Sequence, residues 1–325
     1  MNTTNKLTSE KHIEKAQGCL IGLACGDALG DLGRSDVHRK KYGIITNFYD
    51  DAQSTDDTEF AVLSARILLD CQAKLTTEAI LAGWEKYILR QGGVMDRGGT
   101  PLYGAVANLK RGLLPPLSGQ YNVNNNDDGA AMRAAPFGIT WAGDPIKASE
   151  MVAIDAQISH FADGVWAAQA VAASIAMAMI DASVDDIIQV GLDQMPEGSW
   201  LRHSMNTALK ICENSGTIEA AWEELHTQLW TPSHAMAAEA IPQIYAIFKL
   251  TGGDFHKAMF WACNFGRDAD TIGAVIGALC GARQGIVAIP KAWTKKVQKP
   301  SGVCLRFSRG EDMLQLAAAL CQLPI

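Results

Sequence analysis

Apolar residues recur every three to four positions along most of the chain. FAVLSARILLD (60–70) and VWAAQAVAASIAMAMI (165–180) show this spacing, which is typical of helices that bury one face. Strand-like alternation is confined to YGIITNFY (42–49). We therefore expect an all-α protein in which residues 1–325 form one compact domain. The helices should begin near residues 10, 56, 76, 101, 145, 164, 183, 200, 216, 234, 254, 269 and 310.

One long segment interrupts the helical pattern. GLLPPLSGQYNVNNNDDG (112–129) is rich in proline, glycine and asparagine, residues that favour turns over regular structure. Connections between the other predicted helices are shorter. We expect this segment to be a mobile surface loop.

Glycines are spaced by four in two of the predicted helices. Glycine inside a helix costs about 1 kcal/mol relative to alanine, so the two rows need a compensating role. A glycine at every fourth position leaves one helical face without side chains, which allows another backbone to approach closely. We expect the two helices to pack against each other along these faces. The rows are Gly18, Gly22, Gly26 and Gly30, and Gly273, Gly277, Gly281 and Gly285.

Composition argues against several classes of function. The net charge is −7, the pI is about 5.5 and no run of Lys and Arg exceeds three residues, so we expect neither nucleic acid nor a membrane surface as a partner. Eight cysteines occur without a CxxC pair, which argues against zinc or disulfides and favours the cytoplasm.

The polar N-terminus MNTTNKLTSEKHIEK lacks the apolar core of a signal peptide. Segment 165–180 is too short to cross a bilayer.

The stretch STDDTE (54–59) places two adjacent carboxylates at the start of a predicted helix. Ser54 or Thr55 can cap the helix, and acids are favourable in a first turn. A cap uses only one or two side chains, however, whereas Thr55, Asp56, Asp57 and Thr58 offer four consecutive oxygen donors. A binding site for a hard cation is therefore an alternative to a simple cap.

A second oxygen-rich cluster opens the second glycine helix. GRDADTIG (266–273) places Asp268, Asp270 and Thr271 within one helical turn. Either aspartate alone could be a cap, but two matching clusters on separate helices favour a divalent cation held between them. We expect the helix N-termini to keep these carboxylates ionised at neutral pH.

The chain resembles the ADP-ribosylglycohydrolase family in six motifs, which occur in the family's order. Together STDDT and DADTIGAVIGALCGA are highly specific, and the motifs span most of the chain up to residue 283. The six are GCLIGLACGDALG (18–30), STDDTEFAVLSARILL (54–69), DRGGT (96–100), DGAAMRAAPFGI (128–139), SHFADGVWAAQAVA (159–172) and GRDADTIGAVIGALCGAR (266–283).

The resemblance implies an orthogonal all-α bundle with a metal centre of two Mg²⁺ or Mn²⁺ ions beside a bound ribose. The family's metal ligands match Thr55, Asp56, Asp57, Asp268, Asp270 and Thr271. Its catalytic acid matches Asp96, next to Gly98 and Gly99, whose backbone could hold a diphosphate. Its substrate loop and histidine match Asn126, Asp128, Gly129, Met132, Arg133 and His160.

Each substrate-side residue also has a structural interpretation. Asp96 could stabilise a turn or cap the helix that begins near Pro101. Arg133 could be an ion-pair partner, and His160 could be a hydrogen-bonded core residue. The sequence does not decide between these roles.

Two positions depart from the family pattern. Many members carry a glutamate shortly after GDALG that completes the metal shell, whereas Arg34 stands near that place here. Asp31, Asp50 or Asp51 could replace this ligand, or the centre could be one ligand short. Asp128 stands where an asparagine is usual, which adds negative charge near the expected diphosphate.

The leading hypothesis is a metal-dependent hydrolase that cleaves the ribose C1″ bond of an ADP-ribosylated protein or another ADP-ribose adduct. Carboxylates and metal-held hydroxyls would stabilise an oxocarbenium-like transition state. Asp56, Asp57 and Asp96 are the catalytic candidates, with Asp57 or Asp96 as the base or electrostatic stabiliser. The alternatives are a pseudoenzyme that binds ADP-ribose and a hydrolase of a small-molecule ADP-ribose ester.

Overall fold

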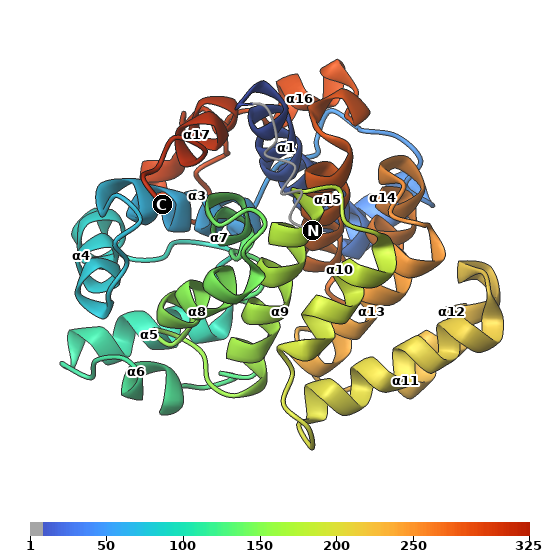
Figure 1. Cartoon of the computed structure of the whole chain (residues 1–325), viewed down its shortest axis with the longest axis horizontal. Coiled ribbons are helices and arrows are strands. Elements are labelled where there is room, and N and C mark those ends of the chain that lie inside the picture. Colours follow the sequence, from blue (N-terminus) through green and yellow to red (C-terminus); the bar gives the residue numbers. More distant parts are fainter. Residues whose placement is uncertain (1–8) are drawn as a thin grey trace, which may run out of the picture.

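The computed structural model describes residues 9–325, and this part of the chain contains helices and no strand (Figure 1). Residues 1–8, which include part of the polar N-terminus and of the predicted domain, lie outside the described residues. The helices are α1 (Ser9–Arg34), α2 (Asp36–Tyr42), α3 (Asp56–Asp70), α4 (Thr77–Tyr87), η1 (Leu89–Gln91), α5 (Thr100–Lys110), α6 (Leu117–Gln120), α7 (Ala135–Thr140), α8 (Pro145–Ala156), α9 (Asp163–Ala178), α10 (Val184–Asp193), α11 (Trp200–Ser215), α12 (Ile218–Gln228), α13 (Ala237–Leu250), α14 (Phe255–Cys263), α15 (Ala269–Gln284), η2 (Ile286–Ala288), α16 (Lys291–Val297), η3 (Arg306–Ser308) and α17 (Met313–Leu320).

The all-α prediction is confirmed, and each predicted helix begins within three residues of the expected position. The sequence missed α2, α6, α7 and α16, which have four to seven residues each. Helices of one or two turns are too short to show a periodic apolar pattern. Within the described residues, no helix combines the length and the apolar character that crossing a membrane requires.

The strand suggested by residues 42–49 does not form. Ile45 is buried there, and its backbone pairs with the side chain of Asn264 instead of with a neighbouring strand. The Ile45 N–H donates to Asn264 Oδ1, and Asn264 Nδ2 donates to the Ile45 carbonyl, both at 2.7 Å. One asparagine therefore satisfies the backbone groups that a strand would have paired.

The segment predicted as a mobile loop is anchored at several points. It contains α6, and the Asn108 side chain donates to the Ser118 carbonyl at 2.8 Å. Asn122 Nδ2 donates to the carbonyls of Pro101 and Ser159, both at 2.8 Å. These bonds fix the segment beside α5, at one border of the cavity described below.

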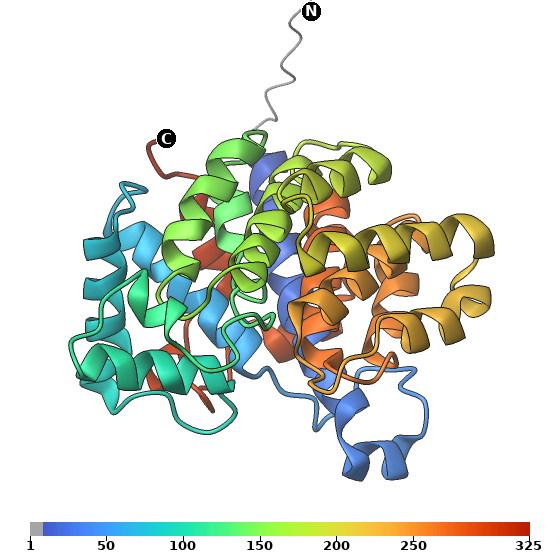
Figure 2. The ribbon, with the colours of Figure 1, turned by 90° about the horizontal axis from the view of Figure 1, so that it is seen from below.

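The two glycine helices pack against each other, as predicted. α1 and α15 lie side by side in the middle of the molecule in both views (Figures 1 and 2). A Cβ atom added at Gly22 would lie 2.1 Å from the Gly277 carbonyl oxygen, and one at Gly26 would lie 1.8 Å from that of Gly273. The paired residues run in opposite directions, so the C-terminal end of α1 meets the N-terminal end of α15.

A carboxylate of α1 also caps α3. Asp27 is fully buried and accepts hydrogen bonds from the backbone N–H of Thr55 at 2.6 Å and of Thr58 at 3.2 Å. It accepts from both threonine hydroxyls as well, at 2.6 and 2.5 Å. Thr55 is the N-cap residue, as expected, but its own side chain makes no capping bond. Asp27 thereby leaves the carboxylates of the first turn free for another role.

Replacing Gly22 with alanine tests the glycine contact. The new Cβ would clash with backbone, which cannot rotate away, so the helices must separate. We expect the free energy of unfolding to fall by roughly 2–3 kcal/mol, as for overpacked cores, measured from urea denaturation curves. Glu14→Ala, at an exposed position of the same helix, is the control. Equal stability of the two variants would contradict the prediction.

Asp27→Asn tests the capping role. Asparagine has one acceptor oxygen in place of two, so the bonds to one carboxylate oxygen are disturbed, and the remaining bonds lose a charged acceptor. We expect a destabilisation of about 2–3 kcal/mol. Asp144→Asn is the matched control, because Asp144 caps α8 through one bond to the Lys147 N–H at 3.0 Å, and asparagine caps equally well. A similar effect of both substitutions on the urea midpoint would refute the role of Asp27.

Candidate functional site

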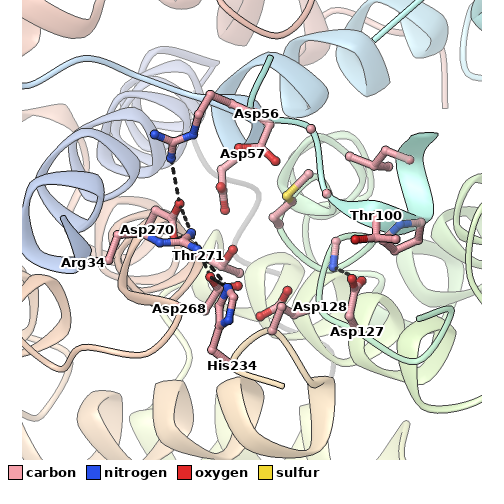
Figure 3. Close-up of a pocket in the computed structure, with 18 of the residues that line it drawn as sticks. Arg34, Asp56, Asp57, Thr100, Asp127, Asp128, His234, Asp268, Asp270 and Thr271 are labelled. Carbon is pink, nitrogen blue, oxygen red and sulfur yellow. Dashed lines mark hydrogen bonds and ion pairs between the residues drawn. The ribbon is translucent and has the colours of Figure 1, made fainter. Parts of the chain in front are cut away.

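One cavity of about 460 Å³ brings the two acidic clusters together. It lies where the C-terminal end of α1 meets the N-terminal ends of α3, α5 and α15. Figure 3 shows carboxylates from three separate segments around it. Its lining consists of Asp31, Arg34, Ser35, Asp56, Asp57, Arg97, Gly98, Gly99, Thr100, Pro101, Leu102, Asp127, Asp128, Gly129, Met132, His234, Ala235, Asp268, Asp270 and Thr271.

Three buried carboxylates form the centre of this cavity. Asp56, Asp57 and Asp270 each offer an oxygen, and these oxygens lie within 4.8 Å of one another. Asp57 Oδ1 is buried and has no hydrogen-bond partner among the described residues. Buried polar atoms are almost always paired, so this oxygen points to a missing ligand. An oxygen-only set of this kind fits a hard divalent cation such as Mg²⁺ or Mn²⁺.

The threonines of the two clusters also fit a cation. Thr271 lines the cavity. Thr55 does not line it, but its hydroxyl donates a hydrogen bond to Asp27 Oδ1, with 2.6 Å between the two oxygens. This leaves the lone pairs of the hydroxyl oxygen available. The metal-ligand role of the six predicted residues stays a prediction.

Burial has a stronger effect on these carboxylates than the helix N-termini do. Desolvation, reinforced by Asp270, raises the pKa of Asp56 well above its usual value. Desolvation and Asp27 do the same to the pKa of Asp57, and the pKa of Asp268 rises to about 7. For Asp56, Asp57 and Asp268, burial and neighbouring like charges thus oppose the ionisation that we expected the helix N-termini to favour.

Two arginines offset part of this negative charge. Arg34 Nη1 lies 2.5 Å from both oxygens of Asp270 and 2.9 Å from Asp268 Oδ1. Burial opposes the charge on Arg34, but the two aspartates outweigh it and raise the arginine's pKa. Arg97 Nη2 lies 2.5 Å from Asp31 Oδ1. Of the alternatives to the family's glutamate, Asp31 is therefore paired, while Asp50 and Asp51 do not line the cavity.

The residues matched to the substrate loop fall into two groups. Asp128, Gly129 and Met132 line the cavity, whereas Asn126, Arg133 and His160 do not. Arg133 is completely buried and paired with Asp155 at 2.6 Å, as its structural interpretation expected. His160 is completely buried too, and its Nε2 lies 2.6 Å from Asp127 Oδ1. His160 thus positions Asp127, which borders the cavity.

The environment of Asp128 opposes the ionisation of its carboxyl group. Burial, reinforced by Asp268 and Asp127, raises its pKa well above the usual value. Its Oδ2 is buried without a hydrogen-bond partner among the described residues. A protonated carboxyl at this position resembles the asparagine usual in the family, since it is neutral and can donate a hydrogen bond.

The DRGGT motif separates Asp96 from the cavity. Asp96 is exposed and is absent from the lining, while Gly98, Gly99 and Thr100 form the cavity wall. Gly99 is the N-cap residue of α5, which has no side-chain cap. Pro101 has no N–H, and the N–H groups of Leu102 and Tyr103 donate to the Gly99 carbonyl at 3.0 and 3.3 Å. The Thr100 N–H and the positive end of the helix dipole therefore remain for an anion. Catalysis by Asp96 stays a prediction that this placement does not favour.

Sequence reasoning missed several residues that border or build the site. Arg97 stands inside the DRGGT motif and Asp127 directly before Asp128, so their positions in or beside the motifs could have identified both as site residues. His234, whose Nε2 lies 2.9 Å from Arg34 Nη2, is a lone histidine that no pattern marks.

Arg267 adopts a φ of 57° directly before Asp268, and its guanidinium is held by buried Glu239 at 2.9 Å. This strained connection sets the direction in which α15 begins.

Two known proteins are similar to this chain in sequence, and a solved structure is similar to it in fold. The ADP-ribosyl-dinitrogen reductase glycohydrolase of Rhodospirillum rubrum is 25% identical over 87% of this chain and 90% of its own length. The ADP-ribosylarginine hydrolase Tri1 of Pseudomonas putida (strain GB-1) is 24% identical over 90% of this chain and 76% of its own. A solved structure titled "ADP-ribosylglycohydrolase-related protein complex" has a TM-score of 0.66 and 21% identity, covering 97% of this chain and 100% of that one.

The family profile described as ADP-ribosylglycohydrolase matches residues 8–324. That match takes in α1, α3 and α15, and with them both acidic clusters of the cavity. This chain belongs to the ADP-ribosylglycohydrolase family.

Proposed function

We propose that this protein hydrolyses the ribose C1″ bond of an ADP-ribose adduct, with the adduct bound in the acidic cavity. The observation that carries the proposal is the buried trio Asp56, Asp57 and Asp270, which fits a divalent cation and lies in a chain of this family. The two relatives named for their activity both act on ADP-ribosylated targets. The ADP-ribose moiety of a modified protein or small molecule is thus the proposed partner.

The α5 end of the cavity is suited to the diphosphate. Gly98 and Gly99 have no Cβ atoms, and the start of α5 offers the Thr100 N–H and the positive end of a helix dipole. The Arg97 guanidinium does not add to this end, because it pairs with Asp31 and lies 3.6 Å from Asp270 Oδ2. The acidic trio lies on the opposite side, where it would meet the ribose instead of the phosphates.

Cleavage of a glycosidic bond develops positive charge at the ribose C1″ and oxygen O4″. Asp56 and Asp57, buried and close together, would stabilise that charge far better than water does. A bound Mg²⁺ or Mn²⁺ would supply polarisation of a water and a fixed place for the ribose hydroxyls. Asp57 would accept the proton of the attacking water through the carboxylate oxygen that does not hold the cation.

The cavity favours Asp57 over Asp96 as the base or electrostatic stabiliser. The sequence leaves both open. Asp57 is 1% exposed and lines the cavity with an unpartnered oxygen, whereas Asp96 is exposed to solvent outside it.

One observation supports a second candidate, a protein that binds ADP-ribose without turnover. Arg34 forms ion pairs with Asp268 and Asp270, two of the predicted metal ligands. If the guanidinium displaced every cation from the site, binding without hydrolysis would remain. Calorimetry separates the candidates, because the binding protein would take up ADP-ribose tightly and turn over no adduct.

We also propose a reducing compartment, in practice the cytoplasm. All eight cysteines lie among the described residues, are free and are mostly buried. Burial raises the pKa of the thiols, for example to about 11 for Cys212, so they are unreactive and suit such a compartment.

Asp57→Asn tests the catalytic role. We expect the rate of ADP-ribose release from an ADP-ribosylated peptide, assayed with Mg²⁺ and with Mn²⁺, to fall by roughly 100-fold or more. Chelation with EDTA should abolish wild-type activity. Asp185→Asn is the control, since that side chain is 80% exposed and outside the cavity. Full activity of Asp57→Asn or of chelated protein would reject the mechanism.

A panel of adducts tests the substrate class. Arginine-linked, serine-linked and acyl-linked ADP-ribose should be hydrolysed at different rates, because the leaving groups differ in size, charge and basicity. We expect at least one protein-linked adduct to turn over in the presence of the cation. Turnover of only a small-molecule ester would move the function to metabolite hydrolysis. Absence of any turnover, together with tight ADP-ribose binding, would favour the binding protein.

A further inference from the structure

The guanidinium of Arg34 lies where a cation between Asp268 and Asp270 would lie. A single nitrogen, Nη1, contacts both oxygens of Asp270 at 2.5 Å and Asp268 Oδ1 at 2.9 Å. Oxygen ligands hold divalent cations at about 2.0–2.6 Å. A cation placed between these carboxylates would therefore coincide with Nη1, and like charges would repel it. Figure 3 shows Arg34 beside Asp270 at the edge of the cavity.

The packing of α1 and α15 fixes Arg34 in this position. Arg34 is the last residue of α1. Just before it, a Cβ at Gly30 would lie 2.0 Å from the Ala269 carbonyl oxygen, and one at Gly33 would lie 1.7 Å from that of Cys263. The end of α1 therefore touches the start of α15 directly. The second arm of the guanidinium, Nη2, contacts His234 Nε2 at 2.9 Å.

The trio of Asp56, Asp57 and Asp270 remains able to bind a cation, even though Arg97 Nη2 also lies 3.6 Å from Asp270 Oδ2. A carboxylate has about four lone-pair sites, so Asp270 can contact Arg34 and still contribute an oxygen beside Asp56 and Asp57. Asp57 Oδ1 has no competing partner among the described residues. The Arg34 contacts reach Asp268 and Asp270, and no ion pair joins Arg34 to Asp56 or Asp57 among those residues.

We propose that the centre holds one divalent cation, bound by Asp56, Asp57 and Asp270, and that the Arg34 guanidinium occupies the second cation position as a permanent positive charge. This differs from the two ions that the family resemblance implies. Asp268 Oδ1 makes no hydrogen bond among the described residues, but it lies 2.9 Å from Arg34 Nη1 as an ion pair. In this proposal Asp268 is therefore the ion-pair partner of Arg34 and not a metal ligand. The inference rests on the cation binding of the proposed function, but it concerns the number of ions and not the reaction.

The number of metal ions bound per protein molecule tests the inference without an activity assay. We expect wild-type protein to bind one equivalent of Mn²⁺ in calorimetry and to retain one by elemental analysis after gel filtration. Its electron paramagnetic resonance spectrum should show an isolated Mn²⁺ without coupling to a second ion. Two equivalents, or a coupled spectrum, would overturn the inference and leave the proposed function intact. No binding at all would reject both.

Charge reversal at the second position should create a second site. We expect Arg34→Glu to bind two equivalents of Mn²⁺, whereas Arg90→Glu should still bind one. Arg90 is the matched control because it is 72% exposed and does not line the cavity. An unchanged count of one in folded Arg34→Glu would contradict the inference.

Variants of the aspartates keep the test decisive if Arg34→Glu fails to fold. We expect Asp57→Asn to weaken the single Mn²⁺ site by at least 100-fold, because a direct ligand is lost. Asp268→Asn should preserve one equivalent with an affinity within a few-fold of wild type, because Asp268 contacts the guanidinium instead. Equal losses in the two variants would show that Asp268 is a ligand and would overturn the assignment of Arg34.

Discussion

The backbone contact between α1 and α15 is the constraint on which the site depends. Opposed glycines bring the two helices so close that a single Cβ at Gly26 would enter the space of the Gly273 carbonyl. Since the helices run in opposite directions, this contact carries the end of α1 to the start of α15. Arg34 reaches the acidic cluster for that reason, and Asp27 reaches the first turn of α3. Spacing between the charged groups is thus set by packing and not by the charges themselves.

The cavity is held together against its own electrostatic repulsion. Of the described residues, seven aspartates but only two arginines line it, and burial raises the pKa of several of these carboxyls. Such an arrangement is unfavourable without a compensating cation. The surrounding core supplies the stability that keeps it in place, with Asp27 capping α3 and Glu239 holding Arg267. Strain and uncompensated charge concentrated in one cavity are typical of a functional site.

Sequence patterns predicted the long helices, the glycine contact and both acidic clusters because each has a regular or repeated signal. What they could not predict depends on which residues meet in space. Nothing in the sequence indicated that Asp27 would cap another helix, or that Asn264 would pair with Ile45 in place of a strand. Arg34 was noticed only as a departure from a motif, and its ion pairs follow from helix packing. The short helices and the raised pKa values of the buried carboxyl groups also depend on tertiary contacts, so a local sequence pattern does not predict them.

The pairing of α1 with α15 also has a consequence for how the chain folds. Arg34 and Asp270 are 236 residues apart in sequence, so their contact closes a loop that contains most of the protein. Contacts of such long range form late, because the loss of chain entropy precedes the gain. During synthesis, the glycine face of α1 stays unpaired until α15 has left the ribosome. Binding of a cation to the finished cavity would therefore report that the whole chain has folded, not just one part of it.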